Sequence, residues 1–137
     1  MKAIEILCAE HRVIERVLTA LETGTWMLSV EEPLHLEFFN QVLEFITGFA
    51  DTCHHQKEEG ILYKTMTEIG DTQGDAMVAA MLHEHELARN YTSGLQLATQ
   101  RLIHGDQNAI SDIVHQSRHY TALLNHHIII EDKFVFP

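Results

Sequence analysis

The chain has 137 residues, of which 45% are hydrophobic, enough for one domain with a real core. Its formal net charge of -11, from 20 acidic and 9 basic residues, argues against charge-driven binding to nucleic acid or to an anionic membrane. Polar residues interrupt every apolar stretch before it reaches the length of a membrane span, and Glu5 and Glu10 interrupt the apolar region that a signal peptide needs. We therefore expect a cytoplasmic protein, with Cys8 and Cys53 as reduced thiols.

Breaker residues divide the chain into four stretches with helical periodicity. The stretches run from about Lys2 to Leu28, from about Pro33 to Ile69, up to about Ile103, and from Asp106 or Ser111 to the Phe136-Pro137 end. GDTQGD at residues 70–75 reads as a turn whose aspartates cap the next helix, and HGDQ at residues 104–107 closes the third helix. Short connections between long helices predict an all-α, up-down-up-down antiparallel four-helix bundle, with residues 1–137 as a single domain.

Each predicted helix carries a histidine on its apolar face. The first has His11 within the series Ile4, Leu7, Ile14, Leu18 and Leu21; the third has His85 within Val78, Met81, Ala88 and Leu95. The fourth has His127 and Glu131 within Ile110, Ile113, Tyr120, Leu124 and Phe134. In the second, Phe38, Val42, Phe45, Ile46 and Phe49 define a broad face that lies closer to His54 than to His55. The histidines at positions 55, 83, 115, 119 and 126 (His55, His83, His115, His119 and His126) fall off these faces and are expected at the surface or behind the ligands.

Two of the core-facing histidines have a glutamate four residues further on, in the pairs His54 with Glu58 and His127 with Glu131. Positions i and i+4 lie on the same face of a helix, so each pair directs an imidazole and a carboxylate at one point. Together with His11 and His85 they supply four nitrogens and two carboxylates. Burying such groups is costly unless they are paired or coordinated, and the pattern therefore predicts a two-metal site. Mixed imidazole and carboxylate ligation suits iron, and also manganese or zinc.

The chain resembles the hemerythrin-like, or HHE cation-binding, domains over essentially its whole length. The resemblance is carried by AEHRVIERV at residues 9–17, CHHQKEEGILY at 53–63, LHEHELAR at 82–89 and HHIIIEDKFVFP at 126–137. HHQKEE matches the His-Phe-x-x-Glu-Glu motif of hemerythrin, with His54 and Glu58 in the ligand positions. The resemblance implies a left-handed four-helix bundle that holds two iron ions, bridged by carboxylates and a water-derived oxygen.

Carried over by position, the resemblance implies that His11 and His54 bind one iron, that His85 and His127 bind the other, and that Glu58 and Glu131 bridge. Asp132 at i+5 is an alternative to Glu131, which we favour because the His-x-x-x-Glu spacing is then kept. The third helix departs from the oxygen carriers, which have two histidines four residues apart, because Met81 and Arg89 flank His85 at that spacing. One nitrogen fewer would leave another exchangeable position, which favours reactivity over reversible oxygen carriage.

These features leave three functional hypotheses open. The first is a sensor or stress-response protein that binds dioxygen, nitric oxide or peroxide and works with a protein partner or electron donor. The second is a di-iron oxidoreductase or iron-handling enzyme, and the third is a metal-free bundle with a hydrogen-bonded polar core. Tyr120, two turns before His127, is a candidate donor of a hydrogen bond or proton to the site. Glu59 is a candidate partner of Lys57, of an arginine on a neighbouring helix or of a ligand histidine. Cys8 and Cys53 are candidate redox thiols, although inert cysteines are the simpler interpretation.

Overall fold

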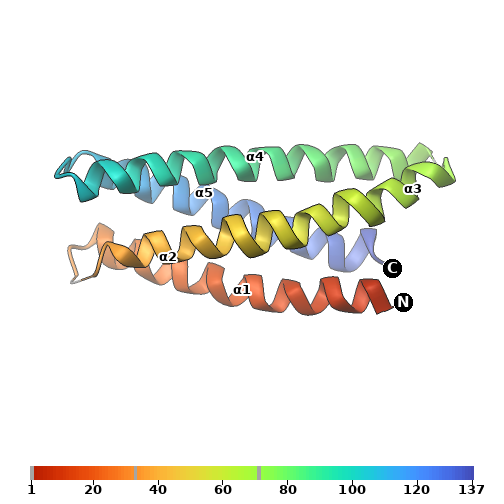
Figure 1. Ribbon diagram of the computed structural model, residues 1–137, viewed down its shortest axis with the longest axis horizontal. Helices are drawn as coiled ribbons and strands as arrows, with labels where there is room; N and C mark the ends of the chain where they lie inside the picture. Colours follow the sequence, from red (N-terminus) through yellow and green to blue (C-terminus); the bar gives the residue numbers. More distant parts are fainter. Residues whose placement is uncertain (1, 33, 71) are drawn as a thin grey trace.

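Four long helical rods lie side by side in the computed structural model, which describes residues 2–32, 34–70 and 72–137 (Figure 1). The first rod is α1 (Lys2–Ser29), and the third is α4 (Thr72–Ile103). The second is assembled from α2 (Glu37–Phe45), η1 (Ile46–His55), η2 (Glu58–Tyr63) and α3 (Lys64–Ile69), and the fourth from α5 (Ala109–Ile130) and η3 (Glu131–Val135). The segments labelled η are π-helical, with wider turns than an α-helix.

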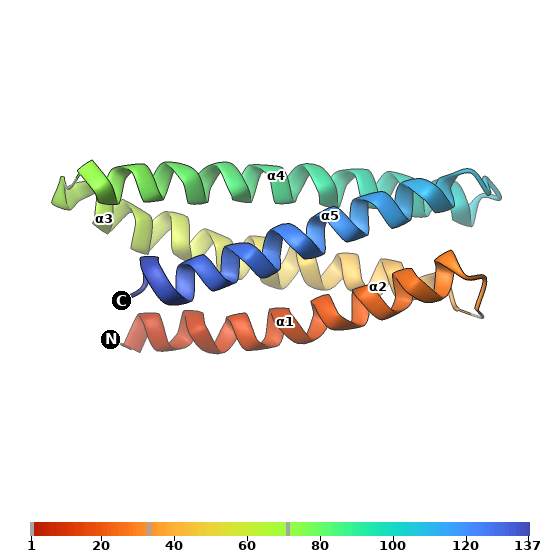
Figure 2. The same ribbon diagram turned by 180° about the vertical axis from the view of Figure 1, so that it is seen from behind.

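Successive rods run in opposite directions, so that the chain goes up, down, up and down, and both termini lie at the same end (Figures 1 and 2). α4 packs most extensively against α5, and α5 in turn against α1. The second rod contacts both α1 and α4, which closes the ring of neighbours. The predicted four-helix bundle is therefore confirmed. Within the described residues, no helix combines the length and the apolar character that crossing a membrane requires.

The predicted apolar faces of the first and third helices point into the core. In α1 the side chains from Leu7 to Leu21 in the predicted series are at most 4% exposed, and in α4 Val78, Met81, Ala88 and Leu95 are buried. The prediction is wrong at the end of the fourth rod, where Phe134 is 64% exposed. The chain changes there to the wide turn of η3, in which the Phe136 N–H donates to the Glu131 carbonyl five residues back. This change buries Val135 and Phe136 instead.

The predicted turns are shorter in the structure than in the sequence analysis. α4 already begins at Thr72, so Gly74 and Asp75 belong to the helix and not to the turn. The C-cap residue Gly70 has φ of 76°, a left-handed conformation that glycine adopts without steric cost. α5 begins at Ala109, between the two starts considered, and Asp106 accepts a hydrogen bond from the Asn108 N–H. The helix start predicted at Pro33 and the cap predicted at Asp71 lie outside the described residues.

Gly24 lies within α1 and marks a close approach between the first two rods. A Cβ at this position would lie 2.3 Å from Cε2 of Phe38, which also packs edge-on against the fully buried Phe39. The small residue is therefore required by packing and not by a turn. The contact fixes how closely α1 approaches the segment that leads into η1.

We predict that Gly24→Ala lowers the free energy of unfolding by about 1 kcal/mol, because the displaced Phe38 ring outweighs the gain in helix propensity. Gly48→Ala is the matched control, since it lies in the same bundle with no atom within 4 Å of its added Cβ. The control is expected to be neutral or slightly stabilising. Denaturant unfolding of both variants measures the difference, and an equally stable Gly24→Ala protein would contradict the packing argument.

Candidate metal centre

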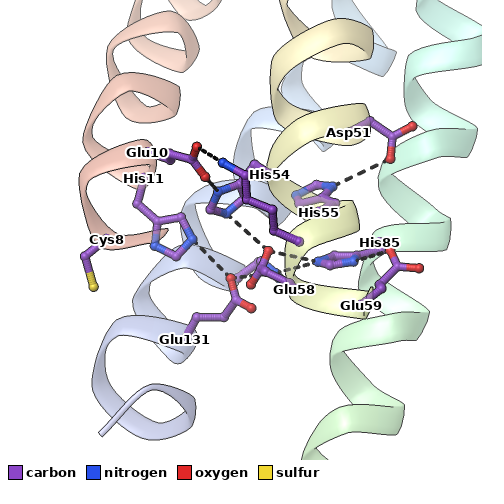
Figure 3. Close-up of polar contacts among 12 residues, drawn as sticks. Cys8, Glu10, His11, Asp51, His54, His55, Glu58, Glu59, His85 and Glu131 are labelled. Carbon is purple, nitrogen blue, oxygen red and sulfur yellow. Dashed lines mark hydrogen bonds and ion pairs between the residues drawn. The ribbon is translucent and has the colours of Figure 1, made fainter. Parts of the chain in front are cut away.

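Seven buried ionisable side chains converge between the four rods (Figure 3). They are His11 on α1, His54 and His55 on η1, Glu58 on η2, His85 on α4, His127 on α5 and Glu131 on η3. None of them is more than 2% exposed. Every rod therefore contributes at least one side chain to a single polar centre.

The seven side chains form two overlapping clusters that share Glu58. One contains His11, His54, Glu58 and Glu131, and the other contains His55, Glu58, His85 and His127. Within each cluster the potential ligand atoms all lie within 4.8 Å of one another. Imidazole nitrogens and carboxylate oxygens in such a set are suitable for a dinuclear metal site with a carboxylate common to both positions.

The inner nitrogen of each of the four predicted histidines faces a carboxylate or another imidazole. Nε2 of His11 and of His127 lie 3.1 and 3.0 Å from the same oxygen, Oε1 of Glu131. Nε2 of His54 lies 3.1 Å from Oε1 of Glu58. Nε2 of His85 is 3.6 Å from that oxygen and 3.1 Å from Nε2 of His127. The inner atoms are thus close enough to bind common ions.

Several of these inner atoms are buried without a hydrogen-bond partner in the described part of the chain. They are Nε2 of His11, Nε2 of His54, Oε1 of Glu58 and Oε1 of Glu131. An unsatisfied buried polar atom costs about 1 to 3 kcal/mol, so leaving four of them in one place requires compensation. Coordinated cations would satisfy the inward-facing atoms together, and the donor set therefore fits two metals.

The outer nitrogen of each predicted histidine bonds to a carboxylate on a neighbouring rod. The Nδ1 to oxygen distances are 2.8 Å for His11 with Asp132, 2.9 Å for His54 with Glu10, 2.8 Å for His85 with Glu59 and 2.7 Å for His127 with Glu84. Each rod supplies one carboxylate to the next rod in chain order, and the last supplies one to the first. Such a bond fixes the ring orientation and leaves Nε2 for a metal.

Cations on the surface hold three of these outer carboxylates. Lys57 Nζ lies 2.6 Å from Glu10, Arg89 lies 2.7 Å from Glu59, and Arg12 pairs with Asp132. Burial opposes ionisation of Glu10, Glu59 and Asp132, but the hydrogen bonds from these cations and from the histidines lower the pKa of each carboxyl group. These three carboxylates therefore remain charged at neutral pH and keep their imidazoles oriented.

Tyr63 connects the two inner carboxylates. Its buried hydroxyl lies 3.1 Å from Oε2 of Glu58 and also donates to Oε2 of Glu131. Burial and the two carboxylates raise the pKa of Tyr63 above its ordinary value, so the phenol keeps its proton. The hydroxyl thus holds both glutamates in place through the oxygens that do not face the histidines.

The ionisable groups of the two clusters differ in whether they hold a proton at neutral pH. Burial opposes protonation of His127, but hydrogen bonds to Glu131 and Glu84 outweigh it and raise its pKa to about 9. Burial and the adjacent Glu131 raise the pKa of Glu58 well above its ordinary value, whereas hydrogen bonds from Glu58 and the histidines overcome burial and lower that of Glu131. Burial lowers the pKa of His54 to about 4. His127 and Glu58 therefore hold protons at neutral pH that metal binding must displace.

The structure brings together all six residues predicted from the sequence and corrects the prediction for His55. We expected His55 at the surface or behind the ligands, but it is 2% exposed and belongs to the second cluster, where its ring stacks on His85 at 3.9 Å. The cause is the wide turn of η1, in which the Gln56 N–H donates to the Asp51 carbonyl five residues back. Adjacent side chains diverge less there than in an α-helix, so His54 and His55 both face inward. The second helix thus supplies a fifth imidazole. The expectation that the centre lacks one nitrogen, and therefore favours reactivity over reversible oxygen carriage, no longer holds.

Glu131 lies within the first cluster, whereas Asp132 lies outside both clusters. Glu131 is fully buried between His11 and His127, whereas Asp132 bonds to the outer nitrogen of His11. The expected contact of Glu59 with a ligand histidine is present at His85. Sequence reasoning missed Glu10, Glu84 and Tyr63. Glu10 and Glu84 each precede a core histidine directly, and that Glu-His dipeptide was the available signal.

The other candidates lie around the centre. Tyr120 is buried beside a cavity that His55 and Asp51 also line, and its role toward the site stays a prediction. Cys8 is half-buried with Sγ 3.8 Å from Asp132, and Cys53 is exposed; both are free thiols. As expected, His83, His115, His119 and His126 are exposed.

Comparison with known proteins agrees with this geometry. The chain matches the family model of the hemerythrin HHE cation binding domain over residues 2–137. It is also similar to the uncharacterized proteins Rv1995 of Mycobacterium tuberculosis and Mb2018 of Mycobacterium bovis, at 24% identity over 135 residues, or 98% of this chain. The chain spans about half the length of these relatives, 52% in each case. No solved structure gives a significant match.

We predict that Glu58→Ala loses more bound metal than Glu59→Ala, because Glu58 belongs to both clusters whereas Glu59 acts through His85. By the same reasoning, Glu131→Ala loses metal and Asp132→Ala retains about two ions per chain, as a paired-metal site requires. Elemental analysis of the four variants measures the outcome. Equal retention within either pair would show that the inner and outer assignments are wrong.

A second prediction concerns pH. Metal affinity should rise as the pH increases from 6.5 toward 9, because His127 and Glu58 must release protons to bind metal. The dissociation constant should fall by about tenfold per pH unit for each proton displaced. Competition with a chelator across this range gives the slope, and calorimetry in buffers of different ionisation enthalpy counts the released protons. A flat profile would mean that the metal-free clusters hold no displaceable protons.

Proposed function

Because the chain belongs to the hemerythrin HHE cation-binding family, we propose that its two clusters hold a dinuclear non-haem iron centre that binds or reacts with dioxygen, nitric oxide or peroxide. The observation that carries the proposal is the convergence of five buried imidazoles and two buried carboxylates, with inward-facing atoms that lack partners in the described residues. The donor set suits iron, manganese and zinc alike, so the preference for iron rests on membership of the family.

Vacant coordination positions support the binding of an external molecule. In the first cluster two imidazoles and two carboxylates would hold one metal, and in the second three imidazoles and Glu58 would hold the other. Both counts fall short of the six donors of an octahedral iron. Bound iron would supply Lewis acidity and electrons to a small ligand at those positions. Even with the imidazole of His55, the second metal would receive fewer than six donors from the protein and could bind an external molecule.

The protein's own residues protect and orient the centre. The Phe136 ring stacks on His11 with 5.3 Å between ring centroids, which covers one side of the first cluster with apolar surface. The four outer carboxylates hold the imidazoles in register, and Tyr63 holds the bridging glutamates. Ligand positions fixed in this way require little reorganisation when metal or a small molecule binds.

We place a binding role, as a sensor or stress-response protein acting with a protein partner or electron donor, before a catalytic one. The alternative is a di-iron oxidoreductase that turns over peroxide or nitric oxide, or that oxidises or donates iron. One observation favours this alternative. The Tyr63 hydroxyl bonds to both Glu58 and Glu131, which puts a hydrogen-bond donor beside the centre.

The test is metal content followed by reactivity. We expect about two irons per chain after anaerobic loading with iron(II), as a paired-metal site requires. Addition of oxygen, nitric oxide or peroxide should then change the visible absorption of the loaded protein. One equivalent consumed per centre supports binding or sensing, whereas many equivalents consumed supports the enzymatic alternative.

His54→Ala and Glu131→Ala are the matched controls, because each removes a donor from the first cluster. Both should lose metal and reactivity while circular dichroism still reports a helical bundle. If the unaltered protein remained without metal after anaerobic loading, the proposal would fail and the seven side chains would form a polar core without ions.

A further inference from the structure

A cavity of about 220 Å³ lies beside the second cluster, between the second rod and α4. Its lining includes Asp51, His55, Arg89, Thr92, Ser93 and Tyr120. His55 is the one member of the two clusters on this wall among the described residues. The volume exceeds what a single water molecule needs, so the cavity has room for a small molecule next to the ring.

His55 differs from the other four histidines in how its ring is held. Each of those has a carboxylate oxygen 2.7 to 2.9 Å from Nδ1. Nδ1 of His55 is buried without a hydrogen-bond partner in the described chain, and the oxygen of Asp51 lies 3.9 Å away. A ligand histidine without this bond is less firmly oriented and less basic than one that has it.

Arg89 accounts for the position of Asp51. Its Nε donates to Oδ1 of Asp51 at 2.8 Å, and its terminal nitrogen donates to Glu59 at 2.7 Å. The oxygen of Asp51 that faces His55 is thus the one that Arg89 binds. Arg89 is 40% exposed and stands at the rim of the cavity. It therefore acts as a positioning residue that holds Asp51 beyond bonding distance of His55.

The rim also determines which molecules the cavity admits. Asp51 and Arg89, the charged residues of the lining, form an ion pair with Nε 2.8 Å from Oδ1, so the rim carries no net charge that would attract a small ion. The hydroxyl-bearing residues Thr92, Ser93 and Tyr120 line the cavity together with the apolar Ala88. These walls suit an uncharged molecule that forms hydrogen bonds and carries a lone pair for a metal.

We propose that His55 is the exchangeable imidazole of the centre and that this cavity admits a small uncharged lone-pair donor to the metal position it vacates. Peroxide, nitric oxide and nitrogen heterocycles belong to that chemical class. The inference rests on the proposed metal centre. Beyond that proposal, it names His55 as the ligand that is displaced, this cavity as the side from which the external molecule approaches, and Arg89 as the residue that controls the exchange.

The first experiment compares His55→Ala with His85→Ala in iron(II)-loaded protein. The two rings stack on each other and are equally buried, but only His85 has a carboxylate bonded to Nδ1. We expect His85→Ala to weaken binding of the second metal by about 10- to 100-fold and His55→Ala to weaken it much less. Imidazole added at pH 8, where it is neutral, should bind to His55→Ala and restore the absorption spectrum of the unaltered protein, whereas azide should bind less tightly.

Two results would overturn the proposal. Loss of one metal from His55→Ala, to the same degree as from His85→Ala, would make His55 a firm ligand. Full metal retention without imidazole binding would mean that His55 does not ligate. If the unaltered protein binds two metals, the proposed metal centre stands, and either result counts against the role of His55 alone.

The second experiment tests Arg89 without altering a ligand. In Arg89→Gln, Asp51 is free to bond to His55, so imidazole should associate more slowly even though the rim is less obstructed. Arg89→Lys should restore much of the rate because it keeps the charge that attracts Asp51. Faster association in Arg89→Gln would show that Arg89 only blocks the entrance and would contradict its positioning role.

The third experiment tests the route. Ser93→Trp places a large ring at the cavity, and Ser111→Trp adds the same ring at an exposed position in α5 outside its lining. Only the first is expected to slow imidazole association, by about tenfold or more if access is limiting. Equal rates in the two variants, with metal content preserved, would exclude this cavity as the path.

Discussion

The hydrogen bond between an outer carboxylate and the Nδ1 of a core histidine is the interaction on which the centre depends. It occurs four times, and each time it joins two neighbouring rods. One bond therefore does three things: it turns an imidazole inward, it fixes which nitrogen is available, and it aligns two helices. Apolar packing alone sets the spacing of helices loosely, whereas these bonds specify the register at which Glu10 meets His54 or Glu84 meets His127.

Much of the fold and of the site could be predicted because both follow from periodicity. His11 and His85 occupy gaps in regular apolar series, and α1 and α4 keep ordinary helical pitch throughout, so their faces project as expected. The failures at His55 and Phe134 occur where the pitch changes, in η1 and η3. A period-based argument assumes constant pitch, and nothing in the local composition signalled the wide turns. Tyr63 was missed for a related reason, because its place between Glu58 and Glu131 depends on how η2 meets the last rod.

Electrostatics explain why so many charges are tolerated in the core. The inner groups share protons, with Glu131 ionised beside a protonated His127 and Glu58 protonated, so the metal-free centre carries little net charge. Three of the outer carboxylates, Glu10, Glu59 and Asp132, are ionised and held by Lys57, Arg89 and Arg12 at the surface. From the middle of the bundle outward, a nearly neutral centre is followed by negative carboxylates and then by positive side chains at the surface. Metals entering this arrangement would exchange with protons, while the outer carboxylates would keep the imidazoles oriented.

The wide turns of the second rod have a consequence for the evolution of such centres. A π-helical turn holds one more residue than the α-helical turn that it replaces, so it is equivalent to a one-codon insertion within a helix. Removing that residue from η1 would rotate the chain on one side of it by about 100° and separate the directions of His54 and His55. The number of nitrogens at the centre can therefore change through the length of the gene, with every ligand codon intact. An alignment that places its gaps only in loops would misread such a change as the loss of a ligand.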